Sequence, residues 1–371
     1  MKVQTMNRAG FVLRDLALGV ASLAALAIVS IPALSQVRMD SMRQACIGNY
    51  RFIAQASGSY SNDYAGSMWA LSWRAGMRNP VSPFQFFSSD TEAQAFQAGL
   101  ILRRLANLTD VQSPIPTGWM SPIGYSHTAL MDYVNLPIPA SYMVCPEDQA
   151  RQRFVEGDFS QLPSNGGDSS SSNWRNPYSS SYSAGTYQWG PSRQTRVAVF
   201  GGTAPTPMWY PTSSDVSIWT VNGTSSINGV NGPKQSSEVR FPSNKVFMSD
   251  EYARHNGKTR YFAYQTAGQD LLFHDGSVRY FRTDSTNPGW DPSGASNRGN
   301  MTRRFSHTKK SDFWGKVDTG TQANFQAGWY RWTRGGLYGW DVPRLTSMVG
   351  KLPTASVIEN EVDTSAATGA W

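Results

Sequence analysis

Residues 10–36 read GFVLRDLALGVASLAALAIVSIPALSQ, and this stretch sets the architecture of the chain. The run 16–34 contains 19 apolar or small residues and no charge. At 1.5 Å per residue, a helix of this length spans roughly 28 Å, about the thickness of a bilayer core. Two interpretations compete. One is a helix that stays in the membrane, and the other is a secretory signal cut before Gln36, with Ala33 and Ser35 as the small residues at the cut.

The residues before this run favour the membrane helix. A short basic leader ends at Gly10, Phe11 follows, and the acidic Asp15 is the fifth residue counted from Phe11. This pattern resembles the type IV prepilin signal of type II secretion pseudopilins and related pilins. The resemblance implies that a membrane peptidase removes the leader 1–10 after Gly10 and methylates the new N-terminus at Phe11.

The resemblance also implies a role for the acidic residue. A carboxylate in an apolar helix is costly unless it is paired. In the family it pairs with the terminal amine of a neighbouring subunit, so Asp15 would supply the charge that registers each subunit during assembly. The family acid is normally Glu, and here it is Asp15 with Arg14 beside it.

The helical pattern continues beyond the apolar run. Apolar residues recur three or four positions apart, as on one face of a helix, at Met39, Met42, Cys46, Tyr50 and Ile53. We therefore predict a spine helix over 11–56, with 11–34 in the membrane and the remainder packed on a globular body. From residue 57 the sequence predicts a loop.

The remaining composition suits an α+β head rather than a helical bundle. Aromatic residues make up 12 % of the chain, and Gly and Pro number 33 and 21. Helical spacing predicts helices over 91–108 and 127–134. Short apolar runs predict an antiparallel sheet that closes with a hairpin, FHDGSVRYF, whose turn holds Asp275 and Gly276. We predict a β-rich head over 57–290, then an aromatic-rich extension and a loose tail over 291–371.

A second resemblance covers parts of this head. Planctomycete-type proteins with a prepilin N-terminus and a large C-terminal domain of unknown function share several landmarks in the same order. They are represented here by CIGNYRFIAQA at 46–56, CPED at 145–148, SSSYSAGTYQW at 179–189, PSNKVFMSDE at 242–251 and the hairpin. The family often has His nine residues before Asp-Gly, whereas His255 lies 20 residues before Asp275.

The chain contains two cysteines, Cys46 and Cys145. If the head faces an oxidising periplasm, two lone cysteines favour one disulfide, which would tie the spine helix to the head. The alternative is a pair of buried free thiols. We expect the disulfide.

Motifs for catalysis or metal binding are missing from the sequence. The four His form no metal-binding pattern, and no strained nucleophile turn occurs. We predict no enzyme activity, no cofactor and no metal. Secretion pseudopilins often hold calcium near the C-terminal sheet, so Asp250, Glu251 and Asp275 are weak calcium candidates that lack the spacing of a ligand loop.

Aromatic side chains near the C-terminus suggest a rival function. Trp329, Tyr330 and Trp332 alternate with arginine and are candidates for stacking on a sugar or a protein partner. Lys and Arg number 33 against 26 Asp and Glu, but they are scattered, so no nucleic-acid partner is expected.

Taken together, these patterns predict a structural subunit of a pseudopilus or pilus-like assembly, of the minor kind given its length. Its expected partners are the inner membrane, prepilin peptidase and like or related pilin subunits. The expected location is the bacterial inner membrane, with the head in the periplasm or in a filament. The alternative is a membrane-anchored or secreted envelope module that binds polysaccharide or protein.

Overall fold

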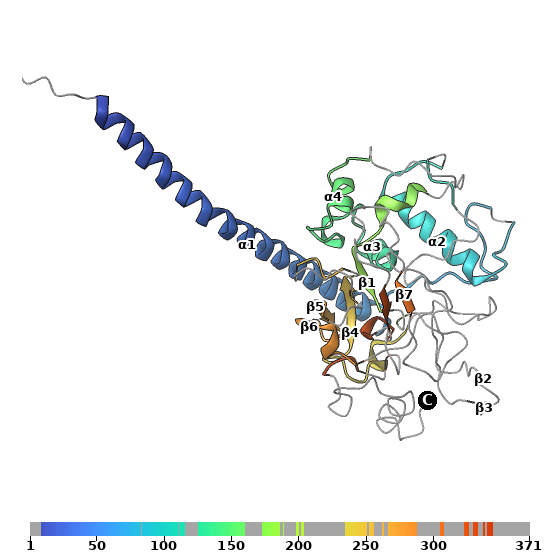
Figure 1. The fold of residues 1–371 in the computed structure, drawn as a ribbon. Coiled ribbons are helices and arrows are strands. Elements are labelled where there is room, and N and C mark those ends of the chain that lie inside the picture. The colour runs from blue at the N-terminus through green and yellow to red at the C-terminus, as the bar shows by residue number, and fades with distance from the viewer. Residues whose placement is uncertain are drawn as a thin grey trace, which may run out of the picture.

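A long helix runs out of a mixed head of helices and strands in the computed structural model of the chain (Figure 1). The head consists of the described residues that follow this helix. The structure describes residues 9–82, 84–110, 112–115, 125–159, 173–185, 188, 198–199, 202–203, 234–250, 252–255, 262, 266–287, 305–307, 323–325, 329–332, 337 and 340–343.

Helix α1 spans Ala9–Asp63 and has 55 residues, which gives a rod of about 83 Å. Its first part projects from the head and its last part lies against it (Figure 1). Cys46, Tyr50 and Ile53 are buried, whereas Met39 is exposed. The predicted helix and the later part of its apolar face are therefore confirmed. Among the residues that the structure describes, no helix is both long and apolar enough to cross a membrane.

The predicted loop after residue 56 is wrong, because α1 continues for two further turns. Contacts with the head stabilise these turns, although their residues are mostly polar. The Ser57 hydroxyl donates to the Ile53 carbonyl at 2.7 Å and accepts a bond from the Trp69 indole at 2.9 Å. Tyr60 packs against Tyr133, with ring centroids 5.2 Å apart. Tertiary contacts thus outweigh the weak helix propensity of this segment.

Three shorter helices lie in the head. Helix α2 spans Asp90–Leu105 and α3 spans Thr128–Val134, close to the two predicted ranges. Helix α4, Gln149–Val155, was not predicted. The described residues also include short 3₁₀ helices: η2 (Ser141–Met143), η3 (Asn173–Tyr178), η5 (Ser236–Glu238), η6 (Thr283–Ser285) and η7 (Trp329–Trp332).

An antiparallel sheet in the order β1-β4-β5-β6 forms the centre of the head. Its strands are β1 (Tyr182–Ala184), β4 (Val246–Asp250), β5 (Gly268–Phe273) and β6 (Val278–Arg282). Every described residue of β1, β4 and β5 is buried, while β6 is more exposed. Two further antiparallel pairs are β2 (Ala198–Val199) with β3 (Gly202–Thr203), and β7 (Phe305–His307) with β8 (Ala323–Phe325). The α+β class is thus confirmed.

The predicted hairpin joins β5 to β6. Gly276 has a φ of +79°, a conformation that favours glycine. The Asp275 carboxylate accepts bonds from the backbone N–H of Ser277 at 2.9 Å and from its hydroxyl at 2.6 Å. Asp275 and Gly276 therefore have the turn role that the sequence predicts.

Helix α1 is joined to this sheet by an ion pair as well as by apolar packing. The Arg43 guanidinium donates two bonds to the Asp270 carboxylate on β5, at 2.7 and 2.8 Å. The main core contains side chains from α1, α2, α3, β1, β4 and β5. The described residues at 329–343 pack against the sheet and are part of the head: Asp341 accepts a bond from the backbone N–H of Val246 at 2.9 Å, and Tyr330 is buried. The tail beyond residue 343 lies outside the described residues.

Candidate functional site

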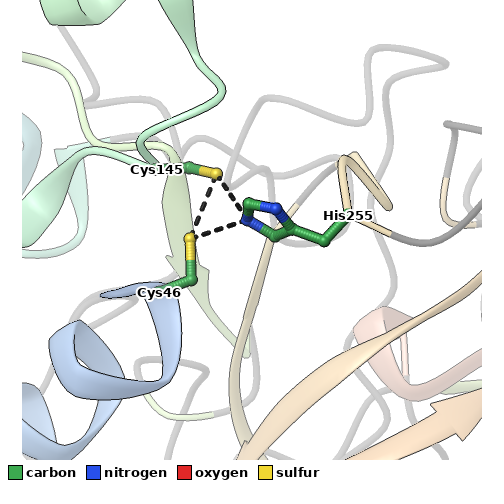
Figure 2. Close-up of side chains that lie close together, drawn as sticks. All are labelled: Cys46, Cys145 and His255. Atoms are coloured by element: carbon green, nitrogen blue, oxygen red, sulfur yellow. Dashed lines mark hydrogen bonds between the residues drawn. The ribbon is translucent and has the colours of Figure 1, made fainter. Parts of the chain in front are cut away.

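Three side chains that can bind a metal or undergo redox chemistry meet beside α1. The sulfur atoms of Cys46 and Cys145 lie 3.1 Å apart. His255 Nε2 lies 3.0 Å from the Cys46 sulfur and 3.2 Å from the Cys145 sulfur. Figure 2 shows the imidazole pointing between the two sulfurs, so the three reactive atoms form a compact triangle.

Each member of this cluster comes from a different part of the chain. Cys46 is on the face of α1 that the head covers, Cys145 lies between η2 and α4, and His255 lies shortly after β4. The backbone N–H of Cys145 donates to the Ser181 hydroxyl at 3.0 Å, which ties the cysteine to the start of β1. Both cysteines are buried. The cluster therefore lies where the spine helix, the sheet edge and the turn before α4 converge.

A buried arginine–aspartate network holds the two turns that carry Cys145 and His255. Arg254 donates to Asp148 at 2.9 Å and also binds Asp250 at the end of β4. Arg151 donates to the same Asp148 carboxylate at 2.6 Å, and so does the Ser181 hydroxyl at 2.7 Å. Because Arg254 is next to His255 and Asp148 is near Cys145 in sequence, the network fixes the two turns relative to each other.

The charges of this network affect its own titration and that of the cluster. Burial works to raise the pKa of Asp148, but Arg254 and Arg151 outweigh it and lower the pKa well below its usual range. Burial raises the pKa of the Cys145 thiol well above its ordinary value, more than the contact with His255 lowers it. Burial works to lower the pKa of His255, but Cys145 and Glu147 raise it overall. In the absence of a bound cation, the Cys145 thiol is therefore neutral near neutral pH.

Polar groups surround the cluster on two sides. The Tyr182 hydroxyl donates to the Cys46 sulfur at 3.1 Å and accepts a bond from the Asn49 amide at 3.1 Å. On the other side, a Glu147 carboxylate oxygen lies 3.5 Å from His255 Nδ1. Cys46 and His255 thus each have a polar neighbour outside the triangle.

The structure brings together the two cysteines that the sequence pairs, but does not join them. A disulfide has its sulfurs about 2.05 Å apart, whereas these lie 3.1 Å apart and both cysteines are free. The disulfide therefore stays a prediction. The sequence did not predict that a histidine joins them. Local spacing patterns cannot detect residues that meet in space but lie about 100 positions apart in the chain. The one hint in the sequence was His255 itself, which the second resemblance singles out although its spacing to Asp275 differs from that of the family.

The calcium candidates do not come together. Val246 at the start of β4 pairs with Phe273 at the end of β5, so Asp275 lies at one end of this strand pair and Asp250 at the other. The Asp250 carboxylate is already bound to Arg254. Glu251 lies outside the described residues. Asp250 and Asp275 are therefore too far apart to share an ion.

Two of the three candidate binding aromatics are buried. Trp329 and Tyr330 are each 2 % exposed. The Tyr330 ring packs against Phe262, and its hydroxyl bonds to Gln269 on β5. The side chain of Trp332 lies outside the described residues. Trp329 and Tyr330 thus belong to the packing of the head and offer no open surface for a sugar.

The predicted processing residues lie at the far end of α1 from the cluster. Gly10, Phe11 and Asp15 are part of the continuous helix that begins at Ala9, and their side chains lie outside the described residues. Comparison with family models, with curated proteins and with solved structures finds no match to this chain.

Proposed function

We propose that the chain is a structural subunit of a pseudopilus or pilus-like assembly, anchored by the first part of α1. One observation supports this most: the two parts of α1 have different surroundings. Cys46, Tyr50 and Ile53 are buried by the head. Earlier in the same helix, Leu23 is 68 % and Ile28 is 72 % exposed.

The exposed apolar side chains are spread around the projecting part of the helix and along its length. Besides those two, they include Leu16, Leu18, Val20, Leu34 and Val37, each at least 59 % exposed. Burying a side chain of this kind contributes about 1.5–3 kcal/mol, so leaving all of them in water is strongly unfavourable. No described part of the head covers these residues. Lipid around a single subunit, or α1 helices of other subunits in a filament, would supply the cover.

The polar residues in this part are compatible with an apolar environment. The Ser22 hydroxyl donates to the Leu18 carbonyl at 2.8 Å within the helix. A hydroxyl satisfied in this way carries a smaller cost in lipid than a free one. Such internal bonding lets serine occur in a helix that is surrounded by hydrocarbon.

The proposed mechanism is assembly. Cleavage after Gly10 frees the amine of Phe11, and Asp15 offers a carboxylate for the amine of a neighbouring subunit. Residues 16–34 would lie in the inner membrane before assembly and would pack helix to helix afterwards. The head, in the periplasm, would then form the outer surface of the filament. The partners in this proposal are prepilin peptidase and like or related pilin subunits.

Replacing Gly10 by valine is expected to leave the precursor uncut, because a side chain at this position blocks access of the peptidase to the peptide bond. The matched control is Gly19→Val, also within α1, where an added Cβ meets nothing within 4 Å. Each protein is produced together with a prepilin peptidase, and its intact mass is measured. Full processing of Gly10→Val, or equal failure of both variants, would contradict the proposal.

A further inference from the structure

We propose that Cys46, Cys145 and His255 form a binding site for a transition-metal ion, with Zn²⁺ as the preferred occupant. The proposal rests on three potential ligand atoms that converge in the structure, each 3.0–3.2 Å from the other two. All three belong to residue types that coordinate metals directly. This site is independent of the assembly proposed for the N-terminal part of α1.

The donor set indicates the class of metal. Two sulfurs and one imidazole nitrogen suit Zn²⁺ and other soft or borderline metals, whereas Ca²⁺ and Mg²⁺ take oxygen ligands. Two thiolates also balance the charge of one Zn²⁺, which suits a site where both cysteines are buried. The Cys₂His set leaves one tetrahedral position for water.

The geometry fits a metal with a small adjustment. Ideal tetrahedral bonds would place the sulfurs about 3.8 Å apart and each sulfur about 3.5 Å from the nitrogen. The three atoms therefore need to separate by about half an ångström to admit Zn²⁺. A disulfide needs the sulfurs about 1 Å closer, and it gives no reason for His255 Nε2 to face both of them (Figure 2).

The surroundings of the histidine match those of a metal ligand. A metal-bound histidine commonly directs its second ring nitrogen at a carboxylate, which fixes the orientation of the ring. Here Glu147 Oε1 lies 3.5 Å from His255 Nδ1, within ion-pair distance, although no hydrogen bond joins the two atoms. The buried Arg254 network holds the same turn. The turn that carries the imidazole is thus held from outside the cluster, and a carboxylate lies near its second ring nitrogen.

An ion bound at this position would cross-link distant parts of the chain. Cys46 and Cys145 are 99 residues apart, and Cys145 and His255 are 110 residues apart. One ion would join α1, the turn before α4 and the segment after β4. An ion that binds only the folded chain stabilises it. Ala45, Asn49 and Pro146, which are close in sequence to the two cysteines, line a surface cleft.

The test is a titration of the full chain, purified in detergent under reducing conditions, with Zn²⁺ and with Co²⁺ as a spectroscopic probe. We expect one equivalent of metal and, with Co²⁺, the charge-transfer and visible bands of tetrahedral coordination by sulfur. Cys46→Ser, Cys145→Ser and His255→Gln should each weaken binding by more than about 100-fold. Glu147→Gln should weaken it by about 10–100-fold, as for loss of an outer partner of a ligand.

His127→Gln is the control, because His127 is buried in the head and is not part of the cluster. It should keep full metal binding. Failure of the reduced wild-type chain to bind either ion would overturn the proposal, and so would equal loss of binding in His127→Gln and His255→Gln. Recovery of the native protein with a Cys46–Cys145 disulfide and no metal would also overturn it. None of these results bears on whether the chain is cleaved after Gly10, so the metal site and the proposed function can be refuted independently of each other.

Discussion

Replacing Arg254 by methionine is expected to lower the free energy of unfolding by about 3–5 kcal/mol, because removing one partner leaves buried charges uncompensated. The Arg254 side chain is 8 % exposed, and its partners Asp148 and Asp250 are 4 % and 10 % exposed. Methionine keeps much of the length of the side chain but supplies neither charge nor donors. Urea denaturation of the full chain in detergent, followed by tryptophan fluorescence, measures the loss.

The matched control is Arg104→Met on the surface of the head. Arg104 pairs with Asp132, and these side chains are 53 % and 42 % exposed. Exposed pairs contribute about 0–1 kcal/mol, so this variant should unfold close to the wild type. A loss below about 1 kcal/mol for Arg254→Met, no greater than that of an exposed pair, would show that the network does not hold the turns of Cys145 and His255.

Replacing Ile53 by alanine is expected to lower the free energy of unfolding by about 2–5 kcal/mol, the usual cost of a large-to-small change in a core. Ile53 is fully buried in the cluster that joins α1 to the head. Alanine favours the helix itself, so the loss reports packing against the head. The same denaturation experiment measures it.

Val37→Ala is the control for this change within the same helix. Val37 is 65 % exposed on the projecting part of α1. Exposed substitutions away from special features usually stay within about 0.5 kcal/mol. Similar effects of Ile53→Ala and Val37→Ala on unfolding of the head would contradict the division of α1 into a covered part and a projecting part.

The elements that the sequence predicts well are those with a strong local pattern. The spacing of Cys46, Tyr50 and Ile53 predicts a helix with one covered face, and all three are buried. The Asp275–Gly276 turn could be predicted because a tight turn needs a residue with positive φ, and glycine is the residue that adopts it most readily; Gly276 has this conformation. The last turns of α1 could not be predicted, because distant partners such as Trp69 stabilise them.

The site could be predicted only in part, for the same physical reason. The pairing of Cys46 with Cys145 follows from their number and their expected compartment. His255 reaches the two cysteines because the sheet and the Arg254 network position its turn. These are tertiary contacts, and no local sequence pattern predicts them. The aromatic run at Trp329 and Tyr330 is hydrophobic in either setting, so the sequence could not distinguish a binding surface from buried packing.

The most direct test of the proposed function is the N-terminal residue of the mature protein, determined by mass spectrometry on protein isolated from the membrane and soluble fractions of the cells that make it and from their medium. The account predicts a chain that begins at N-methylated Phe11. A chain that begins at Gln36 would mean that the apolar run is a secretory signal, removed from the mature protein. That result would contradict the proposal that the projecting part of α1 anchors the subunit and packs against its neighbours.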